Sequence, residues 1–169
     1  MFDSLLRLQN LDLDIEALLK REKEIPKQKE KFKIHRARLA TELEESEKKC
    51  KDLLLEQRDC EGEIEVKLAD IAKKETQLLA VKKNEEYQAL LHEMELQKKQ
   101  NSVKEERIIA IMLESDDAKA HFQEDEKRIA LEQKDIEAQC DKIDEELNVA
   151  VKEREALQNE REPLSKEID

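Results

Sequence analysis

The chain has 169 residues, of which 45% are charged and only 2% are aromatic, and its net charge is −12. This composition excludes an ordinary globular core and leaves disordered chains and coiled coils, two classes that hydrophobic periodicity distinguishes. One glycine and two prolines provide too few turns for a sheet or a many-turn fold. We therefore expect an all-α protein, provided that the chain shows a heptad pattern.

The acidic residues are concentrated in the second half of the chain. Residues 1–84 contain 19 acids and 19 bases, whereas residues 85–169 contain 25 acids and 13 bases. The acidic half would repel phosphates, so nucleic-acid binding and docking on an anionic membrane are both disfavoured. The longest apolar run, residues 108–113, is far too short to span a bilayer, and no signal peptide is visible. We expect a soluble, cytoplasmic protein.

The residue types that usually carry chemistry are few and scattered. Cys50, Cys60 and Cys140 are an odd number without C-x-x-C spacing, so we expect free thiols. The three histidines stand alone, which predicts no zinc site within this chain, and the single glycine rules out a Gly-rich phosphate loop. We expect no enzymatic activity.

A heptad pattern begins at Leu8 and continues to Val81, and it predicts a first helical arm over residues 4–82 that Asp3 or Ser4 caps. Fifteen of its 22 positions are apolar: Leu8, Leu11, Ile15, Leu18, Glu22, Ile25, Lys29, Phe32, Arg36, Leu39, Leu43, Ser46, Cys50, Leu53, Gln57, Cys60, Ile64, Lys67, Ile71, Lys74, Leu78 and Val81. Three polar exceptions cluster around Pro26, where the missing backbone donor predicts a kink or a restart of the helix.

Residues 82–86 are predicted to form the tip of a hairpin. Asn84 is a favoured N-cap residue, and Glu85 and Glu86 would lie where the helix dipole favours acids. Lys82 and Lys83 would lie at the end of the first arm, where the dipole favours bases. The pattern changes phase across this segment, which favours a turn over one continuous helix.

A second arm is predicted over residues 85–163, ending at Pro163. Nine of the eleven positions in one strict seven-residue column are apolar: Met94, Asn101, Ile108, Ser115, Phe122, Ile129, Ile136, Ile143, Ala150, Leu157 and Leu164. A companion column is largely polar and predicts a narrower stripe than that of the first arm; it contains Gln97, Lys104, Asp125 and Glu132.

The two arms predict a single domain over residues 1–169, a long antiparallel two-helix coiled-coil hairpin kinked near Pro26 with its tip near Asn84. In this arrangement residue i faces roughly residue 168 − i, so the basic residues 20–38 would face the acidic residues 130–148. A parallel homodimer of one continuous helix would instead place like charges side by side, which is unfavourable. The hairpin is therefore favoured.

Two surfaces of this hairpin are candidates for binding protein partners. At the tip, Tyr87 stands with Leu90 and Leu91 beside Asn84 and Glu86, where no further helix covers them. The alternative is that Tyr87 packs on Leu79 or Val81 as a cap, and the sequence does not decide between them.

The second candidate surface is a segment that is apolar around the whole helix, with Ile108, Ile109, Met112 and Leu113 as its candidate binding residues. A two-helix hairpin can bury only one side of such a segment, so the rest would form an exposed apolar patch. The alternative is a local core in which Gly62 lets the arms approach closely.

Residues 5–12, the Ile25-Pro26 interruption and above all residues 81–95, VKKNEEYQALLHEME, resemble a family of bacterial proteins that combine a coiled coil with a zinc ribbon. The resemblance covers essentially the whole chain, and the tip motif is its most specific part. It implies an antiparallel hairpin followed by a C-terminal ribbon that binds zinc through two Cys-x-x-Cys pairs. This chain contains neither pair, so zinc is expected only in a ribbon beyond Asp169.

The family resemblance also implies a function in protein binding. Family members are implicated as adaptors for the alternative sigma factor RpoN and for parts of the flagellar or type III export apparatus. We therefore expect a non-enzymatic adaptor, with a structural spacer or dimerising rod as the alternative. A third hypothesis, an arm that contacts RNA, is disfavoured by the acidic second half.

Overall fold

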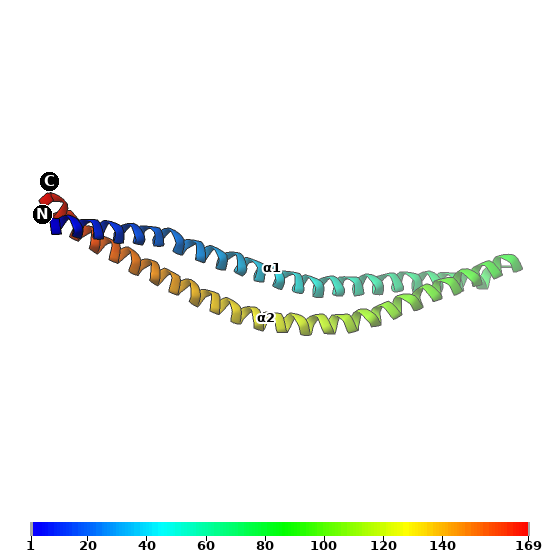
Figure 1. The fold of residues 1–169 in the computed structure, drawn as a ribbon. Coiled ribbons are helices and arrows are strands. Elements are labelled where there is room, and N and C mark those ends of the chain that lie inside the picture. Colours follow the sequence, from blue (N-terminus) through cyan, green and yellow to red (C-terminus); the bar gives the residue numbers. More distant parts are fainter. Residues whose placement is uncertain (1, 169) are drawn as a thin grey trace. The chain divides into compact units, whose positions relative to one another are not determined.

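The computed structural model describes residues 2–168 and contains two long helices. Helix α1 spans Phe2–Ala80, residues 81–83 form a short link, and helix α2 spans Asn84–Ile168. The blue start of α1 lies beside the red end of α2 (Figure 1). The predicted all-α, antiparallel two-helix coiled-coil hairpin with its tip near Asn84 is confirmed.

The hairpin divides into two units by its contacts. Residues 2–41 pack with residues 128–168 in what we call the terminal unit, and residues 42–127 form the tip unit. The core of the terminal unit consists of Ile25, Ile143 and Ala150, with Leu18 and Phe32 against them.

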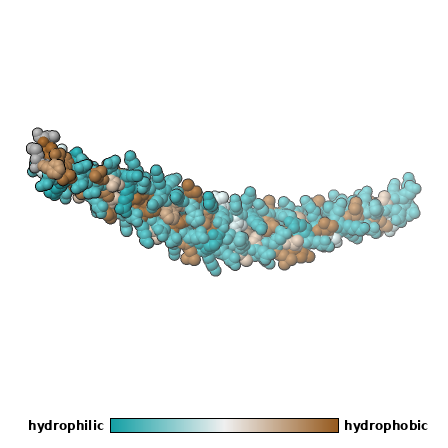
Figure 2. Space-filling model, viewed as in Figure 1, coloured by the Kyte–Doolittle hydropathy of each residue, from teal (hydrophilic) through white to brown (hydrophobic). Residues whose placement is uncertain are grey.

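The tip unit has a core of its own. Leu53 and Cys60 from α1 pack with Ile111 and Ala118 from α2, and Cys50 borders this cluster. The face of the molecule seen in Figure 2 is mostly hydrophilic, with separate apolar patches.

The heptad pattern predicted the buried face of both helices. Of the 22 stripe positions from Leu8 to Val81, which lies in the link after α1, 21 are buried or half-buried, and Arg36 is the exception. In α2, all eleven positions of the strict column are buried or half-buried. The companion column also faces α1, because Ile111, Ala118 and Asp125 are buried. The stripe on α2 is therefore wider than its apolar residues alone predicted.

Polar members of the companion column meet charged partners on α1. Gln97 donates a hydrogen bond to Asp70 at 2.5 Å. Arg154, which lies outside this column in the terminal unit, pairs in the same way with Glu22 at 2.7 Å, and both side chains are largely buried. Such positions join the interface by pairing rather than by hydrophobicity, which is why their apolar count underestimates their burial.

Charge complementarity between the basic and acidic stretches is visible at two contacts of the terminal unit. Lys29 Nζ lies 2.9 Å from Asp144, and His35 lies 3.8 Å from Glu132. Lys29 pairs five residues beyond the expected position 139. His35 pairs one residue before its expected position 133.

Both prolines lie inside helices. Helix α1 continues through Pro26, so the predicted possibility of a restart is wrong, while a kink there stays a prediction. Helix α2 continues past Pro163 to Ile168, five residues beyond the predicted end. Proline removes one helical hydrogen bond, and the turns on both sides continue the helix here. At the start of α1, Asp3 lies within the first turn, where its charge favours the helix dipole.

Candidate protein-binding surfaces

The turn between the helices is made by residues 81–83. The backbone N–H of Tyr87 donates to the carbonyl of Lys83 at 3.1 Å, which is the first helical hydrogen bond of α2. Lys83 is therefore the N-cap residue and Asn84 the first helical residue, so the predicted cap was wrong by one position. Glu85 and Glu86 occupy the first turn as predicted, whereas Lys82 and Lys83 lie in the link after α1 has ended.

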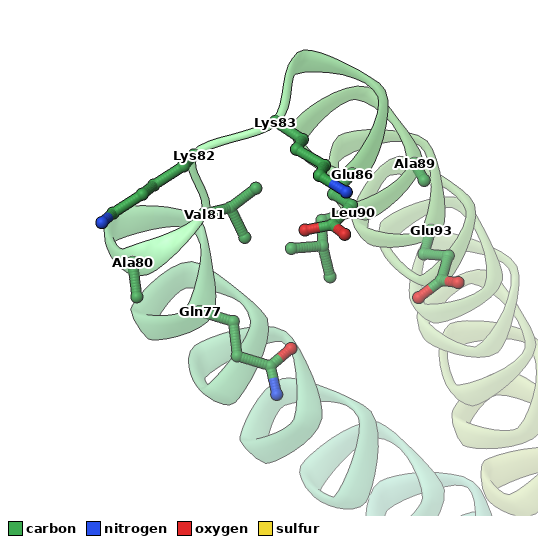
Figure 3. A pocket seen from close by; sticks show the side chains of 9 residues that line it. All are labelled: Gln77, Ala80, Val81, Lys82, Lys83, Glu86, Ala89, Leu90 and Glu93. Atoms are coloured by element: carbon green, nitrogen blue, oxygen red, sulfur yellow. The ribbon is translucent and has the colours of Figure 1, made fainter.

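A cleft of about 680 Å³ opens between the end of α1 and the start of α2. Val81 and Leu90 point toward one another across it, Gln77 lies below them, and Lys82 points away (Figure 3). The cleft has an apolar floor and a charged rim, which suits an apolar side chain of a partner better than a charged small molecule. The complete lining is Gln77, Ala80, Val81, Lys82, Lys83, Glu86, Ala89, Leu90 and Glu93.

The predicted tip residues differ in their exposure. Asn84 and Glu86 are exposed, and Tyr87 is 40% exposed. Leu90 and Leu91 are half-buried, and of the two only Leu90 lines the cleft. Leu79, one of the two residues that Tyr87 was predicted to cover as a cap, is 89% exposed, so Tyr87 does not bury it.

An ion-pair network supports the cleft from below. Lys74 contacts Asp70 and Glu93 at 3.2 Å each, and Asp70 also accepts the hydrogen bond from Gln97. Burial opposes the charge of Lys74, but its hydrogen bonds to Glu93 and Asp70 raise its pKa above the usual value. The hydrogen bonds from Gln97 and Lys74 lower the pKa of Asp70. Lys74 and Asp70 therefore stay charged at neutral pH, and the network joins the two helices beneath the tip.

The second surface is an apolar patch on α2 that consists of Ile109, Met112 and Leu113. These side chains are 61%, 51% and 65% exposed. Met112 and Leu113 lie three and four residues after Ile109, so both are its neighbours on the helix surface. Ile108 is half-buried against the core of the tip unit and does not belong to this patch.

Gly62 does not bring the helices together. A Cβ atom built at Gly62 would meet no atom within 4 Å, and the residue is exposed. The alternative prediction, a local core formed by close approach at Gly62, is therefore wrong. At this level of the hairpin, Cys60 and Ile111 pack in the interface between the two helices instead.

Two basic residues next to the patch are engaged with α1. Arg107 contacts Glu56 through two hydrogen bonds of 2.9 and 3.1 Å, and Lys104 contacts Glu63 at 2.5 Å. The hydrogen bond from Arg107 lowers the pKa of Glu56, and that from Lys104 lowers the pKa of Glu63. These pairs hold α2 in a fixed rotation against α1, with the patch exposed.

A comparison with protein-family models matches residues 8–169 to the CT398-like coiled coil hairpin domain. The chain belongs to this family. Among curated proteins, no sequence matches it. In this CT398-like hairpin, both candidate surfaces, the tip cleft and the apolar patch, lie within the tip unit.

Solved structures share the fold of this CT398-like hairpin at low sequence identity. CT398 from Chlamydia trachomatis is 23% identical, with a TM-score of 0.84 over 99% of this chain and 71% of that one. A protein from Mycobacterium smegmatis is 20% identical, with a TM-score of 0.71 over 99% and 70% of the two chains. HP0958 from Helicobacter pylori is 19% identical, with a TM-score of 0.57 over 96% and 71%.

Other features of the CT398-like hairpin bear on its chemistry. Cys50, Cys60 and Cys140 are free thiols, as predicted. Among the described residues, no group of three or more His, Cys, Asp or Glu side chains could hold a metal ion. Between residues 2 and 168, neither helix has a stretch apolar enough to cross a membrane.

The sequence did not identify all residues of the two surfaces. Gln77, Ala80 and Ala89 line the tip cleft but carry no signal of their own, because small and polar residues are common on coiled-coil surfaces. The acids around the apolar patch were also missed. These acids lie three and four residues from the patch in the sequence, and this spacing could have identified them as its neighbours on the helix surface.

Proposed function

We propose that the protein is a non-enzymatic, cytoplasmic adaptor whose hairpin binds protein partners through the tip cleft and the apolar patch. The observation that carries the proposal is the exposure of Ile109, Met112 and Leu113 as one group on α2. Neighbouring exposed apolar residues usually mark interaction surfaces, whereas single ones do not. Tyr87, at the tip, is a residue type that often anchors protein interfaces.

The resemblance to bacterial coiled-coil and zinc-ribbon proteins suggests which partners to test first. They are the sigma factor RpoN and components of a flagellar or type III secretion export apparatus. A zinc ribbon following the hairpin belongs to the same proposal. Intact mass and zinc content of the protein from its native cell would test that part.

The binding test uses two variants and one matched control. Tyr87→Ala removes the exposed ring at the tip, and Ile109→Glu places a charge in the apolar patch. Leu131→Glu is the control, because Leu131 is 68% exposed on the same helix but lies outside both surfaces. We expect Tyr87→Ala and Ile109→Glu to weaken capture of RpoN or the export components, with the helical content unchanged. Capture that is equal for all three variants and the parent chain would contradict the proposal.

The alternative function is a structural spacer or dimerising rod, for which the same patch would serve self-association. Sedimentation of the Ile109→Glu variant distinguishes the two. If the protein is a dimerising rod, the Ile109→Glu variant should become monomeric without losing any partner. If it is an adaptor, the variant should lose partner capture.

A further inference from the structure

We propose that the apolar patch binds a basic amphipathic helix of a partner protein. This inference rests on the adaptor function proposed above and specifies the chemistry of the partner at one surface. It is carried by the charges around Ile109, Met112 and Leu113.

Four exposed acids border the patch, two on each side along α2. Glu105 and Glu106 lie four and three residues before Ile109, and Asp116 and Asp117 lie three and four residues after Leu113. Residues at these spacings are neighbours on a helix surface. The patch is therefore an apolar centre with acidic residues one helical turn away at both ends.

Of the nearby bases, Lys104 and Arg107 are engaged elsewhere, and Lys119, three residues after Asp116, forms no ion pair with the four acids among residues 2–168. Lys104 pairs with Glu63, and Arg107 pairs with Glu56 and Glu114. Within residues 2–168, the four bordering acids have no ion pair. Their charge is thus available to a partner, and a basic partner would gain electrostatic complementarity over a neutral or acidic one.

The same charges argue against other occupants. In a symmetric dimer through this patch, the two copies would place acids against acids at both ends, because an isologous interface uses the same residues twice. An anionic membrane would be repelled in the same way. A helix with apolar residues at i, i+3, i+4 and i+7 and lysine or arginine around them matches both the apolar group and its border.

The test uses a synthetic fluorescent peptide and the full chain. The probe is a helical peptide with leucine at i, i+3, i+4 and i+7 and lysine at the flanking positions. One control peptide carries glutamate in place of lysine, and the other has the lysine peptide's composition in shuffled order. We expect fluorescence anisotropy to report binding of the probe at least about tenfold tighter than that of either control, because a wrong charge or a disrupted face loses the complementary contacts.

Two charge-matched variants locate the binding. The border variant is Glu105→Gln, Glu106→Gln, Asp116→Asn and Asp117→Asn. The distant variant is Glu153→Gln, Glu155→Gln, Glu160→Gln and Glu167→Gln, at exposed positions of the terminal unit. Each variant replaces four acidic residues with neutral ones in a chain of net charge −12, so the two variants have equal net charges. We expect the border variant to bind the probe about tenfold more weakly and the distant variant within about twofold of the parent chain, as rim charges contribute modestly but add up.

Leu113→Gln provides a second test at an exposed helical position, where folding should be preserved. It should also weaken probe binding about tenfold or more, as loss of a central apolar contact does. Equal binding of the lysine and glutamate peptides would overturn the inference. So would equal losses in the border and distant variants, which would indicate attraction by net charge alone.

Failure of the inference can be distinguished from failure of the adaptor function. If Ile109→Glu abolishes capture of a partner but the lysine peptide shows no preference, the inference is wrong and the adaptor function stands. If capture is insensitive to both Tyr87→Ala and Ile109→Glu, the adaptor proposal is wrong whatever the peptide does.

Discussion

Asn101 occupies a seam position of α2 with only 5% of its surface exposed. Neither Nδ2 nor Oδ1 of its side chain has a hydrogen-bond partner among the described residues. A buried polar group without a partner costs about 1–3 kcal/mol, because it gives up its hydrogen bonds to water. Leucine has the same branched shape without polar atoms and is a better helix former by about 0.5 kcal/mol. Asn101→Leu should therefore raise the free energy of unfolding by roughly 1.5–3.5 kcal/mol.

Urea unfolding followed by circular dichroism measures this change. The matched control is Asn148→Leu, because Asn148 is exposed on the same helix and would gain only the helix-propensity term. Asn101→Leu should exceed this control by at least about 1 kcal/mol. An equal effect of the two substitutions would refute the reasoning, since it would mean that ordered water satisfies the amide in solution. Sedimentation should accompany the measurement, because a seam asparagine can also specify association state.

Three further predictions concern stability and accessibility. Gly62→Ala should raise the unfolding free energy by about 0.5–1 kcal/mol in thermal melts, because the added methyl group meets open space; a lower melting temperature would contradict this. The pKa of Glu56 is lower in the folded chain, so its pairing stabilises the fold above the unfolded pKa of about 4.3 and is lost as the pH falls through the folded value. The stability advantage of the parent chain over Glu56→Gln should thus shrink between about pH 6 and about pH 3 in urea titrations, and a constant advantage would refute the assigned pairing. Cys60, which is 6% exposed, should react with a thiol reagent more slowly than the other two cysteines, and equal rates would show that the seam opens there.

The fold was predictable because a coiled coil repeats one simple rule along its whole length. Seam positions recur every three and four residues, so many weak signals agree and single exceptions do not disturb the pattern. Lys29 and Lys74 are charged members of the stripe, yet both lie in the interface because partners on α2 accept their charge. The turn was found for the same reason, since the pattern changes phase there.

Local details were less predictable. The N-cap falls on Lys83 rather than Asn84, because the position of the cap depends on where the backbone enters the helix and not only on side-chain preference. The companion column was underestimated because its polar residues pair across the seam. Gln97 and Asp70 illustrate the point, since 27 residues separate them in the chain and neither signals the other locally.

The exposed patch and its border differ in what the sequence can predict. Ile108 and Ile111 occupy the seam, and Ile109, Met112 and Leu113 then have no place in any two-helix interface, so their exposure follows from periodicity alone. The charge available at the border does not follow in this way. It depends on whether nearby bases turn toward the patch or toward α1, and the structure turns Lys104 and Arg107 toward α1. A preference for basic partners is therefore a property of the folded hairpin that composition alone does not determine.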